Sequence, residues 1–321
     1  MIALRIKKNL FAWLFGFALL GFTTYLLLDT FVLVRKYTAV QASPPRFETT
    51  GIEIAAGTDS ETTDDTEESA VVITEPVSTD TSYTDGNIEI VLTDYRIADT
   101  TVHVADVSLT SAEYLRTALA QNTYGRNVTQ KTSAIADSVN AILAINGDYY
   151  GAQRSGYVIR GGVLYRSTAD GDAEDLVIWR DGSFSIIRES EISAEELLEQ
   201  GAWDVLSFGP ALIENGEIAV SEDDEVGRAM ASNPRTAIGI VSEGHYVFIV
   251  ADGRTGDDDG LTLYELAAFM QSLGVQTGYN LDGGGSSSMV FMGTVINTPT
   301  TNGRSSGERS VSDIVYIGYG V

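Results

Sequence analysis

The chain of 321 residues contains no cysteine, and it is poor in basic residues and in histidine. Without cysteine it has no disulfide framework, no thiolate metal site and no cysteine nucleophile. Its 20 Lys and Arg residues stand against 45 Asp and Glu residues, so the formal net charge is −25. This balance disfavours nucleic acid as a partner, because binding to a phosphate backbone requires clustered cations.

The two histidines, His103 and His245, fall in predicted strands away from the motifs described below. We therefore expect structural or exposed roles for them. A Ser-His-Asp triad is poorly supported, and acid–base chemistry is expected to rest on carboxylates.

A long apolar run covers residues 10–34 and is interrupted only by Asp29 and by small or weakly polar residues. At about 1.5 Å per helical residue, it is long enough to cross a bilayer. Three basic residues lie in the preceding segment 1–9, which favours a cytoplasmic N-terminal tail. The sequence thus predicts a single-pass anchor in the cell membrane, with an extracellular C-terminal domain. A cleaved signal peptide is the alternative, because residues 40–42 resemble a signal peptidase site.

A linker of residues 35–86 is expected to follow the apolar run. From about Pro44 it is rich in Thr, Ser, Asp and Glu, and it has no Lys or Arg after Arg46. Such a composition cannot bury enough apolar surface to offset the entropy cost of ordering. We therefore predict an acidic, disordered spacer and a folded domain at residues 87–321.

The pattern of this domain indicates an α+β fold. Two capping boxes, at residues 193–196 and 262–265, predict short helices that end near Gly201 and Gly274. Asp-Gly at 181–182 and Asn-Gly at 215–216 predict hairpin turns. Because strands and helices do not alternate regularly, we expect a core of mixed or antiparallel β-sheet with a few flanking helices. Strands are predicted at residues 88–92, 102–109, 142–145, 176–179, 236–241, 246–251 and 314–317.

Polar turns follow three of the apolar strands. Asn146 opens an Asn-Gly-Asp turn, Asp252 opens an Asp-Gly-Arg turn, and Asp282 precedes three glycines and three serines. We expect the three turns to lie along one rim of the sheet. The glycine run can adopt positive φ values and direct successive N–H groups at an anion, so it predicts a phosphate-binding loop. A glycine-rich turn after a strand-end aspartate, with no bound anion, is the alternative.

The motifs of the domain resemble, in order, those of the phosphodiester glycosidase family. They are Ala-Ile-Asn-Gly-Asp-Tyr-Tyr (144–150), Arg-Thr-Ala-Ile-Gly (235–239), Asp-Gly-Arg (252–254), Leu-Asp-Gly-Gly-Gly-Ser (281–286) and Gly-Glu-Arg (307–309). Many bacterial members are linked to exopolysaccharide. The resemblance implies hydrolysis of the bond between an anomeric carbon and a phosphodiester oxygen, with a phosphorylated carbohydrate as substrate and no cofactor.

The resemblance and the charges together suggest a role for each candidate residue. Glycoside cleavage commonly uses two carboxyl groups, so we assign Asp282 to face the anomeric carbon and Asp252 to be its partner, with exchangeable roles. Arginine suits phosphate because its planar guanidinium can hold two oxygens at once. The substrate-binding candidates are Asn146 and Asp148 for sugar hydroxyls, Arg235, Arg254, Gly283, Gly284 and Gly285 for the phosphate, and Ser286 and Arg309 beside them.

Two other functions fit the same residues. One is cleavage of the P–O bond by a phosphodiesterase, although two-metal phosphodiesterases usually carry histidine-rich clusters that this chain lacks. The other is a non-catalytic surface module that binds phosphorylated polysaccharide. No metal is expected. The acidic run Asp257 to Asp259 is similar to a calcium-binding EF-hand loop, but Glu265 falls one position short of the required ligand, so a solvated turn is favoured over calcium.

Overall fold

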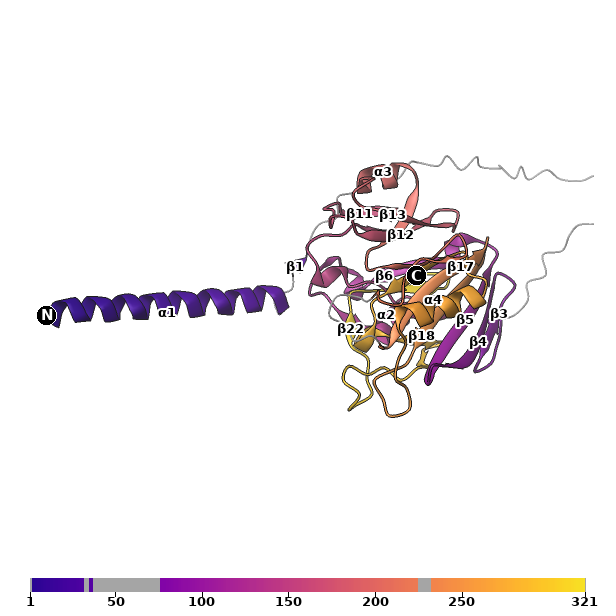
Figure 1. Cartoon of the computed structure of the whole chain (residues 1–321). Coiled ribbons are helices and arrows are strands. Elements are labelled where there is room, and N and C mark those ends of the chain that lie inside the picture. Colours follow the sequence, from indigo (N-terminus) through magenta and orange to yellow (C-terminus); the bar gives the residue numbers. More distant parts are fainter. Residues whose placement is uncertain (1, 32–34, 37–75, 225–231, 321) are drawn as a thin grey trace, which may run out of the picture.

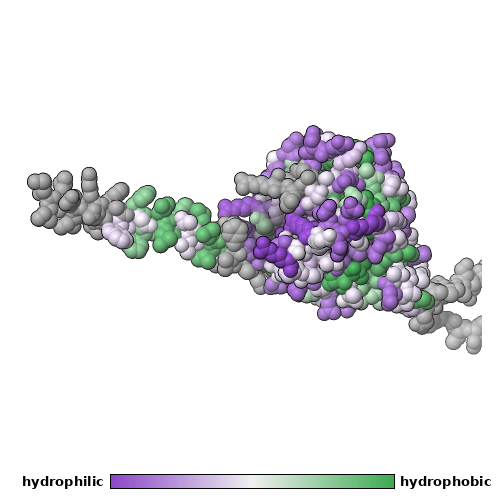
Figure 2. All heavy atoms as spheres, turned by 60° about the horizontal axis from the view of Figure 1, so that its bottom comes forward, coloured by the Kyte–Doolittle hydropathy of each residue, from purple (hydrophilic) through white to green (hydrophobic). Residues whose placement is uncertain are grey.

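The computed structural model describes residues 2–31, 35–36, 76–224 and 232–320. Helix α1 (Ile2–Phe31) lies apart from a β-rich body (Figure 1). Its side chains from Trp13 to Leu28 are exposed, and Figure 2 shows this apolar surface in green. Within the described ranges, no helix has the length and hydropathy required of a membrane span. The predicted anchor at 10–34 is therefore not confirmed, and residues 37–75 of the predicted linker lie outside the described residues.

The ordered body begins earlier than the composition of the linker predicts. Strands β2 (Val77–Ser78) and β3 (Ser82–Thr84) lie within the stretch expected to be linker, yet they extend the largest sheet. The reason is a local anchor at β3. Tyr83 is buried, and the hydroxyls of Tyr83 and Tyr319 both donate to Asp85, at 2.7 and 2.5 Å.

The largest sheet has nine strands, and all of its pairings are antiparallel. Its central strands are the apolar runs that the sequence predicts as strands. In spatial order the strands are β16 (Glu217–Ile218), β15 (Ala211–Glu214), β19 (Thr277–Leu281), β17 (Arg235–Ser242), β18 (His245–Ala251), β5 (Thr100–Leu109), β4 (Ile88–Ile97), β3 and β2.

Two five-stranded antiparallel sheets complete the body, together with two short ribbons, β1 with β7 and β22 with β8. One sheet has the order β21 (Thr294–Val295), β20 (Met289–Phe291), β9 (Leu143–Asn146), β23 (Asp313–Ile317) and β6 (Leu115–Leu119). The other has the order β11 (Val163–Arg166), β10 (Val158–Arg160), β14 (Ala202–Leu206), β12 (Glu174–Trp179) and β13 (Phe184–Arg188). The ribbon strands are β1 (Arg35–Lys36), β7 (Gly125–Arg126), β8 (Gln130–Lys131) and β22 (Ser310–Val311).

The alternation of side chains along the strands creates the layers of the body. On β18, Phe248 and Val250 face the core that the nine-stranded sheet shares with β9, β20 and β23. Their neighbours Val247 and Ile249 face the opposite core, which α4 (Leu263–Ser272) covers. Helices α2 (Thr132–Ser138) and α3 (Ala194–Glu199) each cover one of the five-stranded sheets.

Both predicted capping boxes are confirmed, one at the start of α3 and one at the start of α4. Gly201 and Gly274, just beyond the two helix ends, have φ values of +98° and +82°, a region in which glycine carries no steric penalty. The predicted sheet-rich core with few helices is also confirmed, and its sheets are antiparallel. Four single turns of 3₁₀ helix, η1 (Ala112–Tyr114), η2 (Ala120–Asn122), η3 (Tyr150–Ala152) and η4 (Gly284–Ser286), connect the strands.

Candidate active site

The polar turns meet at one rim because of how the central strands pair. Strand β17 is antiparallel to both β18 and β19, with Arg235 opposite the last residue of β18 and Thr236 opposite the last residue of β19. The start of β17 therefore lies beside the ends of its two neighbours. Asp252 and Asp282 directly follow those ends, so three of the predicted motifs lie on the same rim.

The Asn-Gly turn reaches this rim from the adjacent five-stranded sheet. Asn146 is the last residue of β9, and its side chain is buried. Its Oδ1 accepts hydrogen bonds from the Thr236 hydroxyl at 2.8 Å and from the Ser288 amide at 3.2 Å. Asn146 thus connects the two sheets, and it is not among the residues that line the cavity described next.

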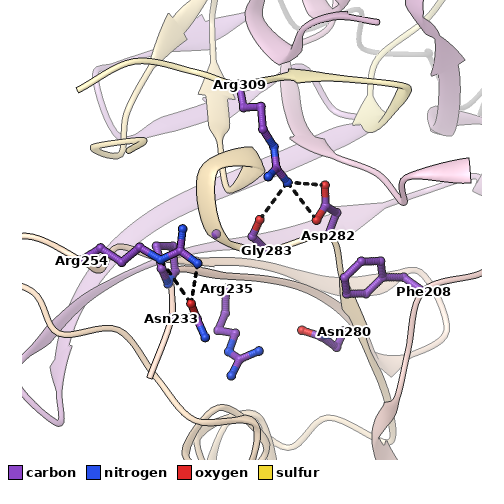
Figure 3. Close-up of a pocket in the computed structure, with 10 residues that line it drawn as sticks. Phe208, Asn233, Arg235, Arg254, Asn280, Asp282, Gly283 and Arg309 are labelled. Carbon is purple, nitrogen blue, oxygen red and sulfur yellow. Dashed lines mark hydrogen bonds and ion pairs between the residues drawn. The ribbon is translucent and has the colours of Figure 1, made fainter. Parts of the chain in front are cut away.

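A cavity of about 190 Å³ opens at the rim (Figure 3). Its charged side chains are three arginines and one aspartate, although the whole chain has a net charge of −25. Its local charge is therefore opposite in sign to that of the chain and suits an anionic ligand. The lining residues are Phe208, Asn233, Pro234, Arg235, Arg254, Asn280, Asp282, Gly283, Gly284 and Arg309.

The single carboxylate of this cavity, Asp282, is held by two donors. Its Oδ2 accepts from the Ser286 hydroxyl at 2.6 Å and from Arg309 Nη2 at 2.9 Å. Burial raises the pKa of the Asp282 carboxyl above its usual value, although Arg309 and Ser286 oppose this effect. The negative charge of Asp148 adds to the increase. Asp282 is therefore a stronger base than an exposed aspartate.

Arg309 is held in position by its own hydrogen bonds and by those of the preceding residue, Glu308. Its backbone N–H donates to the Gly285 carbonyl at 3.1 Å, and its Nε donates to the Ser286 hydroxyl at 2.9 Å. The preceding Glu308 accepts from both the backbone and the hydroxyl of Ser133, at 2.8 and 2.6 Å, which fixes this segment to the start of α2. The Gly-Glu-Arg motif therefore contributes one residue that anchors and one that lines the cavity.

Arg254 has a left-handed backbone, with φ of +59°. Such a conformation costs a non-glycine residue about 1–3 kcal/mol and is often found at functional sites. Its Nη2 donates to Asn233 Oδ1 at 2.6 Å and its Nη1 to the Thr301 carbonyl at 2.8 Å. The guanidinium also lies against Gly284, where a Cβ atom would be 3.1 Å from Nη2. Arg254 is thus held at the cavity in one orientation.

Arg235 is the most enclosed of the three arginines, and its Nε donates to the Leu261 carbonyl at 2.8 Å. Beside it, Asn280 presents a buried Oδ1 that has no hydrogen-bond partner among the described residues, while its Nδ2 donates to the Gly209 carbonyl at 2.8 Å. An unpartnered buried acceptor at a cavity is ready to bind a donor group of a ligand.

Four lining residues were not anticipated from the sequence: Phe208, Asn233, Pro234 and Asn280. Asn280 lies inside an otherwise apolar strand, and this was a signal that could have identified it. Phe208, Asn233 and Pro234 lie outside the motifs, and their place at the cavity depends on the tertiary fold alone.

Asp148 does not line the cavity, although its motif predicts a contact with a sugar hydroxyl. Its carboxylate is fully buried, with Oδ2 accepting from Arg160 Nη2 at 2.8 Å and from the Ser207 amide at 3.0 Å, and Oδ1 accepting from the Tyr150 amide at 2.9 Å. Arg160 also pairs with Asp313, at 2.6 Å. Because its oxygens are occupied within the protein, Asp148 stabilises the turn and is not placed to hold a sugar hydroxyl.

Asp252 likewise lies behind the cavity lining. Its Oδ1 accepts from Asn297 Nδ2 at 3.0 Å and from the Thr298 amide at 2.9 Å, and its Oδ2 is 3.3 Å from His103 Nε2. Burial opposes ionisation, but the hydrogen bonds from His103, Asn297 and Thr298 outweigh it and lower the pKa of Asp252. The geometry therefore favours a positioning role over that of the second catalytic carboxylate.

His103 is not remote from the motifs, contrary to expectation. The pairing of β5 with β18 places it opposite Val250, two residues before Asp252. Its ring bridges Asp252 and the exposed Asp94, whose Oδ1 is 2.7 Å from Nδ1. His245 lies at the other end of β18, away from the motifs, and its Nε2 is 2.9 Å from Asp106 Oδ1.

The glycine run packs closely against neighbouring segments. The Gly284 amide donates to the Pro234 carbonyl at 2.8 Å and so does not point at a ligand. A Cβ atom on Gly283 would lie 2.8 Å from that same carbonyl, and one on Gly285 would lie 2.5 Å from Thr301 Oγ1. The glycines allow the loop to approach these segments, and the arginines supply the positive charge.

The acidic run at 257–259 contacts an arginine. Asp258 accepts from Arg96 Nη1 at 2.8 Å and from the Thr101 amide at 2.7 Å. Among the described residues, no group of three or more His, Asp or Glu side chains is placed to hold a metal ion.

Comparison with known proteins supports the motif assignment. Residues 139–318, more than half of the chain, match the family model described as Phosphodiester glycosidase. The chain belongs to the phosphodiester glycosidase family. All five sequence motifs, from residue 144 to residue 309, lie inside the matched region.

Individual relatives in the family match different shares of this chain. The SPbeta prophage-derived uncharacterized protein YomE of Bacillus subtilis is 30% identical over 201 residues, which is 61% of this chain and 31% of YomE. Mouse N-acetylglucosamine-1-phosphodiester alpha-N-acetylglucosaminidase is 31% identical over 175 residues, 49% of this chain and 33% of the mouse protein. The chain thus spans about a third of the length of the curated relatives it matches.

A solved structure shows the shared fold. The zebrafish N-acetylglucosamine-1-phosphodiester alpha-N-acetylglucosaminidase catalytic domain aligns with a TM-score of 0.58 and 22% identity, covering 73% of this chain and 83% of the zebrafish chain. The phosphodiester glycosidase architecture therefore extends beyond the segment that the family model matches.

Proposed function

We propose that this protein hydrolyses the glycosidic bond of a sugar 1-phosphodiester and releases a free sugar and a phosphomonoester. The observation that carries the proposal is the cavity that Arg235, Arg254 and Arg309 line together with the single carboxylate of Asp282. A phosphodiester supplies one negative charge and several oxygens, which guanidinium groups bind well. The names of the mouse and zebrafish relatives are consistent with this chemistry.

The arginines would stabilise the departing phosphate. When the bond between the anomeric carbon and the phosphodiester oxygen breaks, the electron pair stays on that oxygen, and charge develops in the cavity that the three guanidiniums line. A phosphate is a good leaving group, so a second carboxylic acid to protonate it is not required. This explains how a cavity with one carboxylate can serve a reaction that usually employs two.

Asp282 would act on the anomeric carbon. Either its carboxylate attacks that carbon and the resulting ester is hydrolysed, or it accepts a proton from the water that attacks. In both cases the sugar receives the oxygen and one proton of the water molecule, and the phosphomonoester receives the other proton. Ser286 and Arg309, which both bond to Oδ2, would keep the carboxylate in place.

Isotope labelling tests the bond that breaks. In water enriched in ¹⁸O, a defined sugar 1-phosphodiester should yield ¹⁸O in the free sugar, and none in the phosphate product. Label in the phosphate would instead indicate P–O cleavage, and binding without product would indicate a non-catalytic module. The Asp282→Asn protein is the control for a contaminating hydrolase.

We further propose an extracytoplasmic location and a cell-surface or exopolysaccharide glycan as substrate. The support is in the sequence, where the apolar run at 10–34 precedes the acidic segment and the domain. Protease added to intact cells should then release an active C-terminal domain. A domain that stays protected until the cells are broken would contradict this location.

A further inference from the structure

A second cavity adjoins the arginine-lined one. It has a volume of about 230 Å³, and the residues that it shares with the first cavity are Asp282 and Arg309 alone. The ion pair between these two side chains, 2.9 Å long, therefore stands between the cavities. Each volume is below the roughly 300–1,000 Å³ of pockets for drug-sized ligands, so each suits one small chemical group.

The chemistry of the second cavity differs from that of the first. Apart from the shared ion pair, its lining contains no charged side chain. The hydroxyl-bearing residues Thr129, Ser310 and Ser312 line it together with Tyr149. Neutral hydroxyls beside an exposed aromatic face suit a neutral, polyhydroxylated ring and offer little to an anion.

The second cavity is built on a tightly packed support. A Cβ atom on Gly151 would lie 2.5 Å from Ser312 Oγ, so glycine is required there, and the Gly151 amide donates to the same hydroxyl at 3.2 Å. Tyr149 packs edge-on against Phe208 with ring centroids 5.0 Å apart. Phe208 lines the arginine-lined cavity. The contact between the two aromatic rings is therefore a second connection between the cavities, in addition to the ion pair of Asp282 and Arg309.

We propose that the second cavity binds the neutral sugar ring, while the arginine-lined cavity binds the phosphate of the same substrate. Asp282, which lines both, then lies at the anomeric carbon where the two groups are joined. This assignment rests on the proposed function and adds the place of each half of the substrate. It makes Tyr149 a determinant of sugar recognition and Arg254 a determinant of phosphate recognition.

Binding of the two halves can be measured separately on the full-length protein. The probes are inorganic phosphate, followed by ³¹P line broadening, and a panel of neutral sugars (glucose, galactose, mannose and N-acetylglucosamine), followed by saturation-transfer NMR. We expect at least one sugar to bind, and saturating phosphate should not displace it. Tyr149→Ala should weaken sugar binding about tenfold, as loss of a central aromatic contact does, and should leave phosphate binding unchanged.

Arg254→Gln should give the converse result, and Tyr95→Ala should change neither. Tyr95 is a matched control because its exposed fraction, 38%, is close to the 36% of Tyr149, and because it packs against Phe269, away from both cavities.

Three outcomes would overturn the assignment. They are competition between phosphate and sugar, a failure of every sugar in the panel to bind, and an effect of Tyr149→Ala on phosphate binding alone. Because these measurements need no turnover, they are independent of the ¹⁸O experiment. Two-site binding without hydrolysis would reject only the proposed reaction, and hydrolysis with competitive binding would reject only the sugar cavity.

Discussion

The side-chain amide of Asn146 donates a 2.6 Å hydrogen bond to the backbone carbonyl of Asp282. Asn146 ends a strand of one sheet and Asp282 follows a strand of another, so this bond fixes the position of the acid relative to both layers. The same asparagine accepts from Thr236 and Ser288. Its role in the site is therefore to position Asp282, in place of the sugar contact that its motif suggests.

Asn146→Ala should destabilise the fold and lower turnover together. It leaves the Thr236 hydroxyl and the Ser288 amide without their acceptor, and one unsatisfied buried polar group costs about 1–3 kcal/mol. Urea unfolding with parallel kinetics measures both effects. The control is Asn302→Ala, because Asn302 lies in an exposed loop. Unchanged stability and unchanged kcat in Asn146→Ala would show that the bridge between the sheets is dispensable.

Asp282→Asn should remove most of the activity while the protein stays folded. The change keeps the size of the side chain and removes the charge that attacks the anomeric carbon or accepts a proton. We expect kcat and kcat/KM to fall together by at least about 10²–10⁴-fold. Near-normal kcat in a folded Asp282→Asn protein would exclude Asp282 from the chemistry.

Asp252→Asn should act mainly on stability. An amide at this position replaces one acceptor oxygen with a donor, which would face either His103 Nε2 or the donors Asn297 and Thr298. We therefore expect a loss of about 1–3 kcal/mol in unfolding free energy and a smaller fall in kcat than for Asp282→Asn. If the two variants lost activity equally without loss of stability, Asp252 would be a second catalytic carboxylate after all.

Arg254→Lys tests the fork of hydrogen bonds at the cavity. A lysine keeps the charge, but its ammonium group cannot reproduce the planar geometry that reaches both Asn233 and the Thr301 carbonyl. KM for the phosphodiester should rise, and kcat should fall less than in Asp282→Asn. Steady-state kinetics measure both constants. The control is Arg304→Lys, a change at an exposed loop position, which shows any general effect of replacing an arginine with lysine.

Asp175→Asn should alter the dependence of stability on pH. Burial, reinforced by the charge of Glu189, raises the pKa of Asp175 to about 9. The folded state therefore retains a proton that the unfolded state releases above about pH 4. Because the folded state binds one more proton than the unfolded state in this range, the free energy of unfolding falls as pH rises from about 4 towards 9. The slope cannot exceed about 1.4 kcal/mol per pH unit for one proton.

The asparagine variant should lack this contribution, so its unfolding free energy should decline less between pH 5 and pH 8 than that of the wild type. Denaturant melts across this range measure the difference. Parallel curves for the two proteins would mean that the pKa of Asp175 is not raised in the folded state.

The sequence by itself determined the local features of this protein. The capping boxes of α3 and α4 depend on side chains three residues apart, and the apolar runs of β17 and β18 depend on the pattern along the chain. Both features can therefore be recognised from the sequence without knowledge of the fold. The order of the motifs was sufficient to indicate the family. The strand ends at Arg235, Asp252 and Asp282 also follow from local signals, and antiparallel pairing of adjacent strands brings them to one rim.

Only the tertiary structure decided what each polar side chain does at that rim. Asp148 and Asp252 are local equivalents of Asp282 in sequence, since each lies in a turn just after an apolar strand. The fold provides Arg160 for the first and His103 with Asn297 for the second, and all three partners are distant in sequence. Asp282 alone is left facing a cavity, because burial and the direction of a side chain depend on which distant strands pack around it, and no spacing along the chain encodes that.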